Sequence, residues 1–183
     1  LQSRGLGDVY KRQLKYYTEH YRIQKYEPCS GYVQFMFIDL CPQSFYGLYD
    51  WWGIPKKGLQ AILESNAPVG VFAKHKDHLD SLYIVNDTDG ALGECELTWI
   101  ITETLNGELV EKGSVKAEVP ADSRVMVKTF EKEYGKGKKW NLTLILSDNS
   151  GKCMAKNTYQ DICTLLSRVD GHPDRMSHEF GMR

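Results

Sequence analysis

The sequence predicts a mainly β protein in which an antiparallel β-sandwich, about residues 78–160, follows a short α/β part, about residues 14–70. Three observations lead to this prediction. Apolar and polar residues alternate with period two after residue 78, a continuous apolar run spans residues 32–40, and helix-type spacing flanks that run. A chain of 183 residues, of which 42 % are hydrophobic, is long enough to bury a core.

The two ends of the chain lack these patterns. The opening stretch, LQSRGLGDVYKRQ, has no apolar period, and most of it resembles the translated sequence of a sequencing-library adaptor. We therefore expect residues 1–13 to be non-native or disordered, and the alternative is a genuine polar linker. Residues 161–183 are mixed in character, which predicts an irregular tail.

The first predicted element is a helix over residues 14–26. Leu14, Tyr17 and Tyr21 recur at helical spacing, with charged residues between them. This spacing is the signal for the helix, which Pro28 and the Ser30-Gly31 pair end.

An almost wholly apolar segment, YVQFMFIDL, follows at residues 32–40 and stops at Pro42. Such a run after a helix predicts a strand that is buried on both faces, as in a parallel sheet or barrel. Residues 43–57 are rich in aromatic side chains and loop-like, and residues 58–66 show a short helical pattern. The order helix, buried strand, loop, helix is typical of one α/β unit.

The remaining strands alternate with turns. Asn106-Gly107 is a strong tight-turn signal between two of them. Repeated short strands with period-two alternation indicate an antiparallel sandwich. The predicted strands are Leu82–Val85, Cys95–Thr102, Ser114–Val119, Arg124–Phe130, Trp140–Leu146 and Cys153–Tyr159.

Composition excludes several classes of function. The formal net charge of −1 argues against nucleic acid or an anionic membrane as a partner, and no apolar run is long enough to span a bilayer. The five cysteines are irregularly spaced and form no CxxC pair, so we expect no metal and no cofactor. The HKDHLD segment at residues 75–80 has metal-ligating residue types, but a solvated loop is the simpler interpretation.

One series of residues resembles a known family. It resembles the end of the catalytic barrel in glycoside hydrolase family 2, the group of β-mannosidases, β-galactosidases and β-glucuronidases. Phe35 stands where many members have Trp, and Ile38 stands where many have Asn. The matching residues are Gly31, Phe35, Asp39, Pro42, Asp50, Trp51, Trp52, Gly53, Pro55 and Lys56.

The resemblance implies both a fold and a parent function. Residues 14–70 would be a remnant of the last unit of a (β/α)₈ barrel, and residues 78–160 would be an immunoglobulin-like β-sandwich. The parent would be a retaining β-glycosidase, similar to β-mannosidase, that hydrolyses O-glycosyl bonds of a carbohydrate substrate. The partner of the fragment would be the missing N-terminal barrel and domains of the same polypeptide.

Four residues are the candidate substrate-binding group. The working face of a barrel lies at the C-terminal ends of its strands, where aromatic rings stack on sugars and carboxylates bind hydroxyl groups. For Phe35 and Asp39 the functional and the packing interpretations are even, whereas Phe37 and Trp52 are expected to pack. The candidates are Phe35, Asp39, Tyr46 and Trp51.

No catalytic residue is predicted in the chain. A retaining glycosidase needs two facing carboxyl groups, which this family takes from earlier strands. Glu19 and Glu27 lie at the wrong end of the unit, so the fragment itself is expected to be inactive. The alternative function is a non-catalytic β-sandwich module that binds carbohydrate or protein. An aromatic row of Trp99 and Trp140 would support it, but both side chains fit a core position better.

Overall fold

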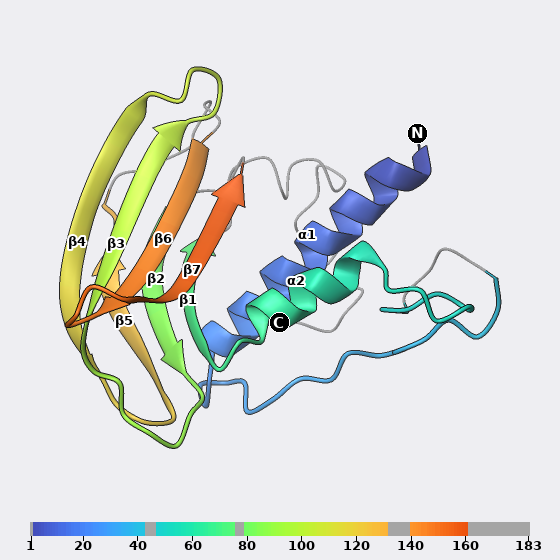
Figure 1. Ribbon diagram of the computed structural model, residues 1–183, viewed down its shortest axis with the longest axis horizontal. Coiled ribbons are helices and arrows are strands. Elements are labelled where there is room, and N and C mark those ends of the chain that lie inside the picture. The colour runs from blue at the N-terminus through green and yellow to red at the C-terminus, as the bar shows by residue number, and fades with distance from the viewer. Residues whose placement is uncertain (1, 43–46, 76–78, 132–139, 161–183) are drawn as a thin grey trace. The chain divides into compact units, whose positions relative to one another are not determined.

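The computed structural model describes residues 2–42, 47–75, 79–131 and 140–160 (Figure 1). It divides the chain into two compact units, Leu1–Gly70 and Val71–Arg183. The protein is mainly β, with antiparallel sheets after a short helical part, and this confirms the predicted fold class. The predicted irregular tail at 161–183 lies outside the described residues.

The first unit contains two helices that pack on each other, α1 (Gln2–Ile23) and α2 (Lys57–Ser65). Their close approach is at Gly58, where a Cβ atom would lie 2.8 Å from Leu14 Cδ1 and 3.3 Å from Tyr10 Cε1. Helix α1 begins well before residue 14, so the predicted helix start was wrong. Packing across the helix pair reaches Tyr10, and the apolar period of the sequence does not record that contact.

The buried face of α1 includes charged side chains. Glu19 and Arg22 are buried, whereas Leu14, Tyr17 and Tyr21 are only partly covered. Burial raises the pKa of the Tyr17 hydroxyl, and the nearby Tyr21 adds to the shift. Burial of a charged residue requires partners, and α2 supplies them.

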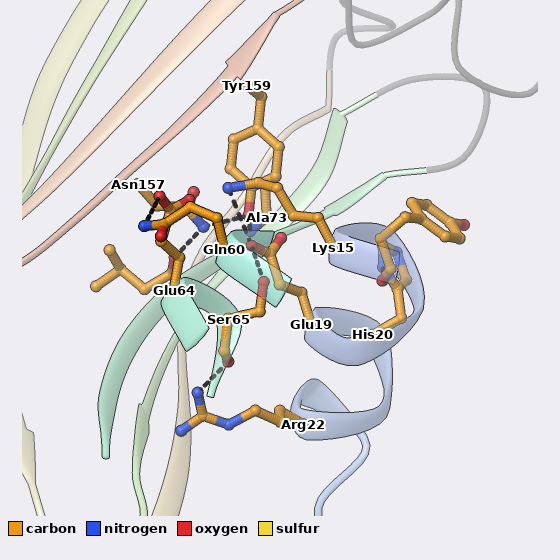
Figure 2. A network of polar contacts seen from close by, with 12 residues as sticks. Lys15, Glu19, His20, Arg22, Gln60, Glu64, Ser65, Ala73, Asn157 and Tyr159 are labelled. Carbon is orange, nitrogen blue, oxygen red and sulfur yellow. Dashed lines mark hydrogen bonds and ion pairs between the residues drawn. The ribbon is translucent and has the colours of Figure 1, made fainter. Parts of the chain in front are cut away.

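Ser65, the last residue of α2, forms hydrogen bonds with both charged side chains (Figure 2). Arg22 donates from Nη1 to the Ser65 carbonyl, and the Ser65 hydroxyl lies 3.4 Å from Glu19 Oε1. Lys15 Nζ pairs with the same glutamate oxygen at 3.3 Å. A guanidinium at the carbonyl end of a helix satisfies an unpaired acceptor and complements the helix dipole. Glu19 therefore has a structural role in the helix pair.

The strand predicted over residues 32–40 is not formed as a regular strand. The described part of this segment has one isolated bridge, between Ile38 and Tyr49, and Val33 is 93 % exposed. A strand needs continuous backbone pairing with a neighbour, and an apolar run does not provide the neighbour. The prediction of a strand buried on both faces was therefore wrong for the chain by itself.

The second unit is a sandwich of a three-stranded sheet, ordered β1-β2-β5, and a four-stranded sheet, ordered β4-β3-β6-β7 (Figure 1). The pairings β2–β5, β3–β4, β3–β6 and β6–β7 are antiparallel. Every strand predicted for the sandwich overlaps an observed one. The strands are β1 (Val69–His75), β2 (Leu79–Asn86), β3 (Gly93–Glu103), β4 (Leu109–Val119), β5 (Ser123–Thr129), β6 (Trp140–Asp148) and β7 (Cys153–Gln160).

The sandwich starts earlier than residue 78, because β1 begins at Val69. Its apolar run VGVFA follows Pro68, and the two valines and the phenylalanine are good strand formers. His75, at the end of β1, is buried with its ring edge-on to Tyr159 at 5.3 Å, so it does not belong to a solvated loop. Asp80 forms an ion pair with Lys74 at 3.3 Å.

Alternation in the sequence corresponds to burial in the core. Leu142, Leu144 and Leu146 of β6 are fully buried, and the residues between them are partly exposed. Strand β2 differs, because the consecutive residues Ile84 and Val85 are both fully buried. This strand is covered on both faces, whereas β6 is covered on one.

Two side chains of β7 connect the edge strands of the two sheets (Figure 2). Asn157 Nδ2 donates to the Val71 carbonyl at 2.9 Å and to the Tyr159 hydroxyl at 2.9 Å. The Ala73 N–H donates to the same hydroxyl at 3.0 Å. Backbone groups of edge strand β1 that lack a neighbouring strand on this side are therefore satisfied by side chains from the opposite sheet.

Candidate functional site

The candidate substrate-binding residues lie in one segment of the first unit, residues 35–56, which we call the rim segment. Phe35 is 81 % exposed and Trp51 is 50 % exposed. Asp39 is buried, and Tyr46 lies outside the described residues. The structure therefore places two of the four candidates at the surface and turns a third inward.

The backbone of the rim segment is held by hydrogen bonds between its own parts. Asp39 N donates to the Tyr49 carbonyl at 3.1 Å, and Tyr49 N donates to the Phe37 carbonyl at 3.0 Å. Lys56 N donates to the Leu48 carbonyl at 2.8 Å. Three short stretches, around residues 38, 48 and 55, thus lie side by side without forming a regular sheet.

The Asp39 carboxylate is enclosed by this backbone. Its Oδ1 accepts the Gly47 N–H at 2.9 Å, and its Oδ2 forms an ion pair with Lys56 Nζ. The Asp39 side chain is 0 % exposed and that of Lys56 is 21 % exposed. A carboxylate removed from water requires such charge-assisted partners, since leaving it unpaired would be costly.

Gly47 is required by this enclosure. A Cβ atom at position 47 would lie 2.7 Å from Asp39 N and 2.7 Å from the Tyr49 carbonyl oxygen, and closer still to Asp39 Oδ1. Backbone atoms cannot move aside as the end of a flexible side chain can. Only glycine therefore fits against the carboxylate.

Asp50 organises the tip of the rim segment, residues 50–54. Its Oδ1 accepts the Trp52 N–H at 2.9 Å and the Ile54 N–H at 2.8 Å. Gly53 completes the turn with a φ of +78°, which glycine adopts without strain. The turn presents Trp51 and Trp52 outward on a locally ordered backbone.

The rim segment exposes more apolar surface than a folded protein usually leaves in water. Phe37 and Trp52, which we expected to pack, are exposed, although Phe37 contacts the Tyr49 ring at a centroid distance of 5.0 Å. Contiguous exposed apolar side chains are typical of a surface that meets another protein segment or a ligand. The large exposed side chains of this region are Val33, Phe35, Phe37, Ile38, Leu40, Trp51, Trp52 and Ile54.

Sequence reasoning missed the partners of Asp39. Lys56 was part of the recognised pattern, but nothing in the pattern pairs it with a carboxylate 17 residues earlier. The available signal was the acid itself, because a carboxylate within an apolar run needs a cation or several N–H donors if it is buried.

Among the described residues, no group of three or more His, Cys, Asp or Glu side chains is arranged to hold a metal. In the HKDHLD segment, Asp77 and His78 lie outside the described residues. Within the described part of the chain, no helix is long and apolar enough to cross a membrane.

Trp99 and Trp140 do not form the exposed aromatic row that the binding-module alternative would need. Trp99 is buried, with its Nε1 donating to Glu111 Oε1 at 3.1 Å and its ring edge-on to Phe130. Trp140 is partly buried at the start of β6. These positions suit packing, and they do not form an exposed platform on one face of the sandwich.

Two solved structures share this fold over most of the chain. The exo-chitosanase of Amycolatopsis orientalis matches with a TM-score of 0.73 over 82 % of this chain, at 17 % sequence identity. The β-D-mannosidase of Dictyoglomus thermophilum matches with a TM-score of 0.68 over 83 % of this chain, at 20 % identity. The chain spans only 18 % of the length of each of these proteins.

Sequence comparison adds no nearer relative. No protein-family model matches the sequence, and no curated protein matches it significantly. The structural likeness therefore shows a shared fold with two proteins whose names describe glycosidases.

Proposed function

We propose that this chain is the C-terminal part of a retaining β-glycosidase of glycoside hydrolase family 2, with a β-mannosidase-like exo activity on O-glycosyl bonds. One observation carries the proposal: the fold matches a piece of an exo-chitosanase and of a β-mannosidase over more than four fifths of the chain. The residue series from Gly31 to Lys56 supports the same assignment independently of the fold.

In this proposal the rim segment borders the sugar site of the parent enzyme. Phe35 and Trp51, both exposed, offer aromatic faces that stack on the C–H surface of a sugar ring, and Tyr46 belongs to the same group. The remaining exposed apolar side chains would be covered by the preceding strands of the barrel, which belong to the same polypeptide. The sandwich would buttress the barrel.

We propose that the part of the chain described by the structure does not supply the catalytic machinery. Retaining hydrolysis needs two carboxyl groups about 5 Å apart across the glycosidic bond, one of them free to attack carbon. In the rim segment Asp39 is enclosed by Lys56 and Gly47, and Asp50 is engaged by the N–H groups of its own turn. We therefore expect the isolated chain to be inactive.

The test compares two purified proteins on p-nitrophenyl β-D-mannoside and p-nitrophenyl β-D-glucosaminide. The isolated chain should release no nitrophenol above the buffer rate, whereas the full-length protein encoded by the intact gene should turn over at least one aryl β-glycoside. A folded full-length protein that hydrolyses none of a panel of β-glycosides would overturn the proposed function.

The inactivity of the chain needs its own control. Turnover by the isolated chain that persists through a second purification, and that disappears when the chain is unfolded, would contradict the argument from missing carboxylates. A Glu19→Gln variant is the matched comparison, because Glu19 is buried between the helices and is not expected to affect any turnover.

A further inference from the structure

We propose that Asp39 is a positioning residue, which acts through Lys56 and Gly47 to hold the tip of the rim segment in place and does not itself bind the sugar. The part that concerns the sugar rests on the function proposed above. The part that concerns the tip rests on the contacts of this chain alone.

Burial separates Asp39 from a ligand. A carboxylate that binds sugar hydroxyl groups must present an oxygen atom at the surface. The Asp39 side chain has no exposed area, and its two oxygen atoms are engaged by the Gly47 N–H and the Lys56 ammonium. The missing space for a Cβ atom at Gly47 shows how closely the backbone covers Oδ1.

The ion pair between Asp39 and Lys56 joins two parts of the rim segment that flank the tip. Asp39 lies before the tip and Lys56 follows it after Pro55, so one contact joins the chain before the tip to the chain after it. Backbone hydrogen bonds reinforce the closure on both sides, from Asp39 N to the Tyr49 carbonyl and from Lys56 N to the Leu48 carbonyl. Charge-assisted contacts between buried groups are strong and geometrically specific.

A second aspartate in the same segment has a different task. Asp50 accepts N–H groups only from within the tip, from Trp52 and Ile54, and therefore determines the local shape of the turn. Asp39 connects the base of the tip to the rest of the segment and therefore determines where the turn is held. The two residues form a matched pair for an experiment, because both are aspartates that accept backbone N–H groups.

The first measurement is amide hydrogen exchange on the full chain, in the wild type and in Lys56→Met and Lys56→Arg variants. Methionine removes the charge and keeps a similar length. We expect the amides of Asp39 and Tyr49 to exchange faster in Lys56→Met by about tenfold or more, because the buried carboxylate loses its cation. Lys56→Arg should restore much of the protection.

Two comparisons make the exchange result specific. Asp50→Asn should accelerate exchange at Trp52 and Ile54 more than at Asp39. Amides of β6, in the other unit, should be unchanged in every variant, which shows that the sandwich remains folded. If Lys56→Met destabilises the chain as a whole, the double variant Asp39→Asn, Lys56→Met removes both charges and should still show faster exchange at Tyr49. Unchanged exchange in that variant would overturn the proposal.

The second measurement is a titration with methyl β-D-mannopyranoside, followed through the indole N–H resonances of Trp51 and Trp52. Lys56→Met should weaken binding by about tenfold if the tip must be held to stack on the ring, and Lys56→Arg should recover it. Binding lost in Asp39→Asn without a change in exchange would show that Asp39 is a direct ligand and would refute the positioning role. Absence of binding by the wild type would count against the sugar contact, whereas the exchange result would still decide whether Asp39 holds the tip.

Discussion

Gly113 allows Trp99 to lie in the core of the sandwich, and a Gly113→Ala substitution tests this packing. The two residues are directly opposite each other in the β3–β4 pairing. A Cβ atom at position 113 would lie 2.8 Å from both Cε2 and Cη2 of the indole, and closer still to Cζ2. Non-bonded contacts of a Cβ atom are essentially never this short, so the ring or the strand must move.

The ring has little freedom to move. Trp99 is 7 % exposed, its Nε1 is hydrogen-bonded to Glu111, and the Phe130 ring packs edge-on at 6.2 Å. Overpacking in such a core costs about 1–3 kcal/mol. Replacing glycine by alanine also restricts the unfolded chain, which returns about 0.4–1 kcal/mol. We therefore expect Gly113→Ala to lower the free energy of unfolding by about 1–2 kcal/mol, a figure that combines these two terms.

The assay is urea denaturation of the full chain, with the shift of the midpoint at constant slope as the readout. Gly90→Ala is the matched control, because a Cβ atom at Gly90 would meet no heavy atom within 4 Å. It should be neutral or slightly stabilising. A Trp99→Phe background should remove most of the Gly113→Ala cost. The smaller side chain lacks the benzo part of the indole, which carries the clashing atoms Cε2, Cζ2 and Cη2. Equal effects at Gly113 and Gly90, or an undiminished cost beside Phe, would refute the reasoning.

Two further predictions concern the same unit. Leu144→Ala should lower the free energy of unfolding by about 2–5 kcal/mol, because this fully buried side chain leaves a cavity in the core; a urea midpoint unchanged from wild type would contradict this. The Ser150 hydroxyl, with the backbone N–H groups of Lys152 and Ser150, holds the pKa of the Asp148 carboxyl below its usual value. Because the folded-state pKa is lower than the unfolded one, the stabilisation is present at neutral pH and is lost as the pH falls through the acid range. Asp148→Asn should reduce the decrease in the free energy of unfolding between neutral and acid pH. An unchanged decrease would exclude this contribution.

The local residue pattern was sufficient to predict the structure where a residue's burial depends only on its position along its own strand. The alternation through Leu142, Leu144 and Leu146 predicted both the strand and its buried face, because successive side chains of a strand point to opposite sides. The Asn106-Gly107 turn signal falls in the connection between β3 and β4, where Gly107 adopts a positive φ of +71°.

Local pattern failed where a residue depends on a distant partner. The run at residues 32–40 is apolar enough for a buried strand, but its described part has no continuous pairing. Helix α1 buries Glu19 and Arg22, which both contact Ser65 more than forty residues away, and the apolar spacing of the helix does not indicate these contacts. Neither outcome can be derived from spacing within one element.

By itself the sequence predicted the class of the protein, the positions of six of the seven described sandwich strands and the residue series that resembles a glycosidase family. The class and the strands arise from periodicity and turn chemistry, which act over a few neighbouring residues, whereas the glycosidase parent is what the family resemblance implies. Only the tertiary structure decided that Phe35 and Trp51 are exposed while Asp39 is enclosed. The enclosure depends on bringing Lys56 and Gly47 against one carboxylate, because a charge leaves water only when the fold supplies its partners.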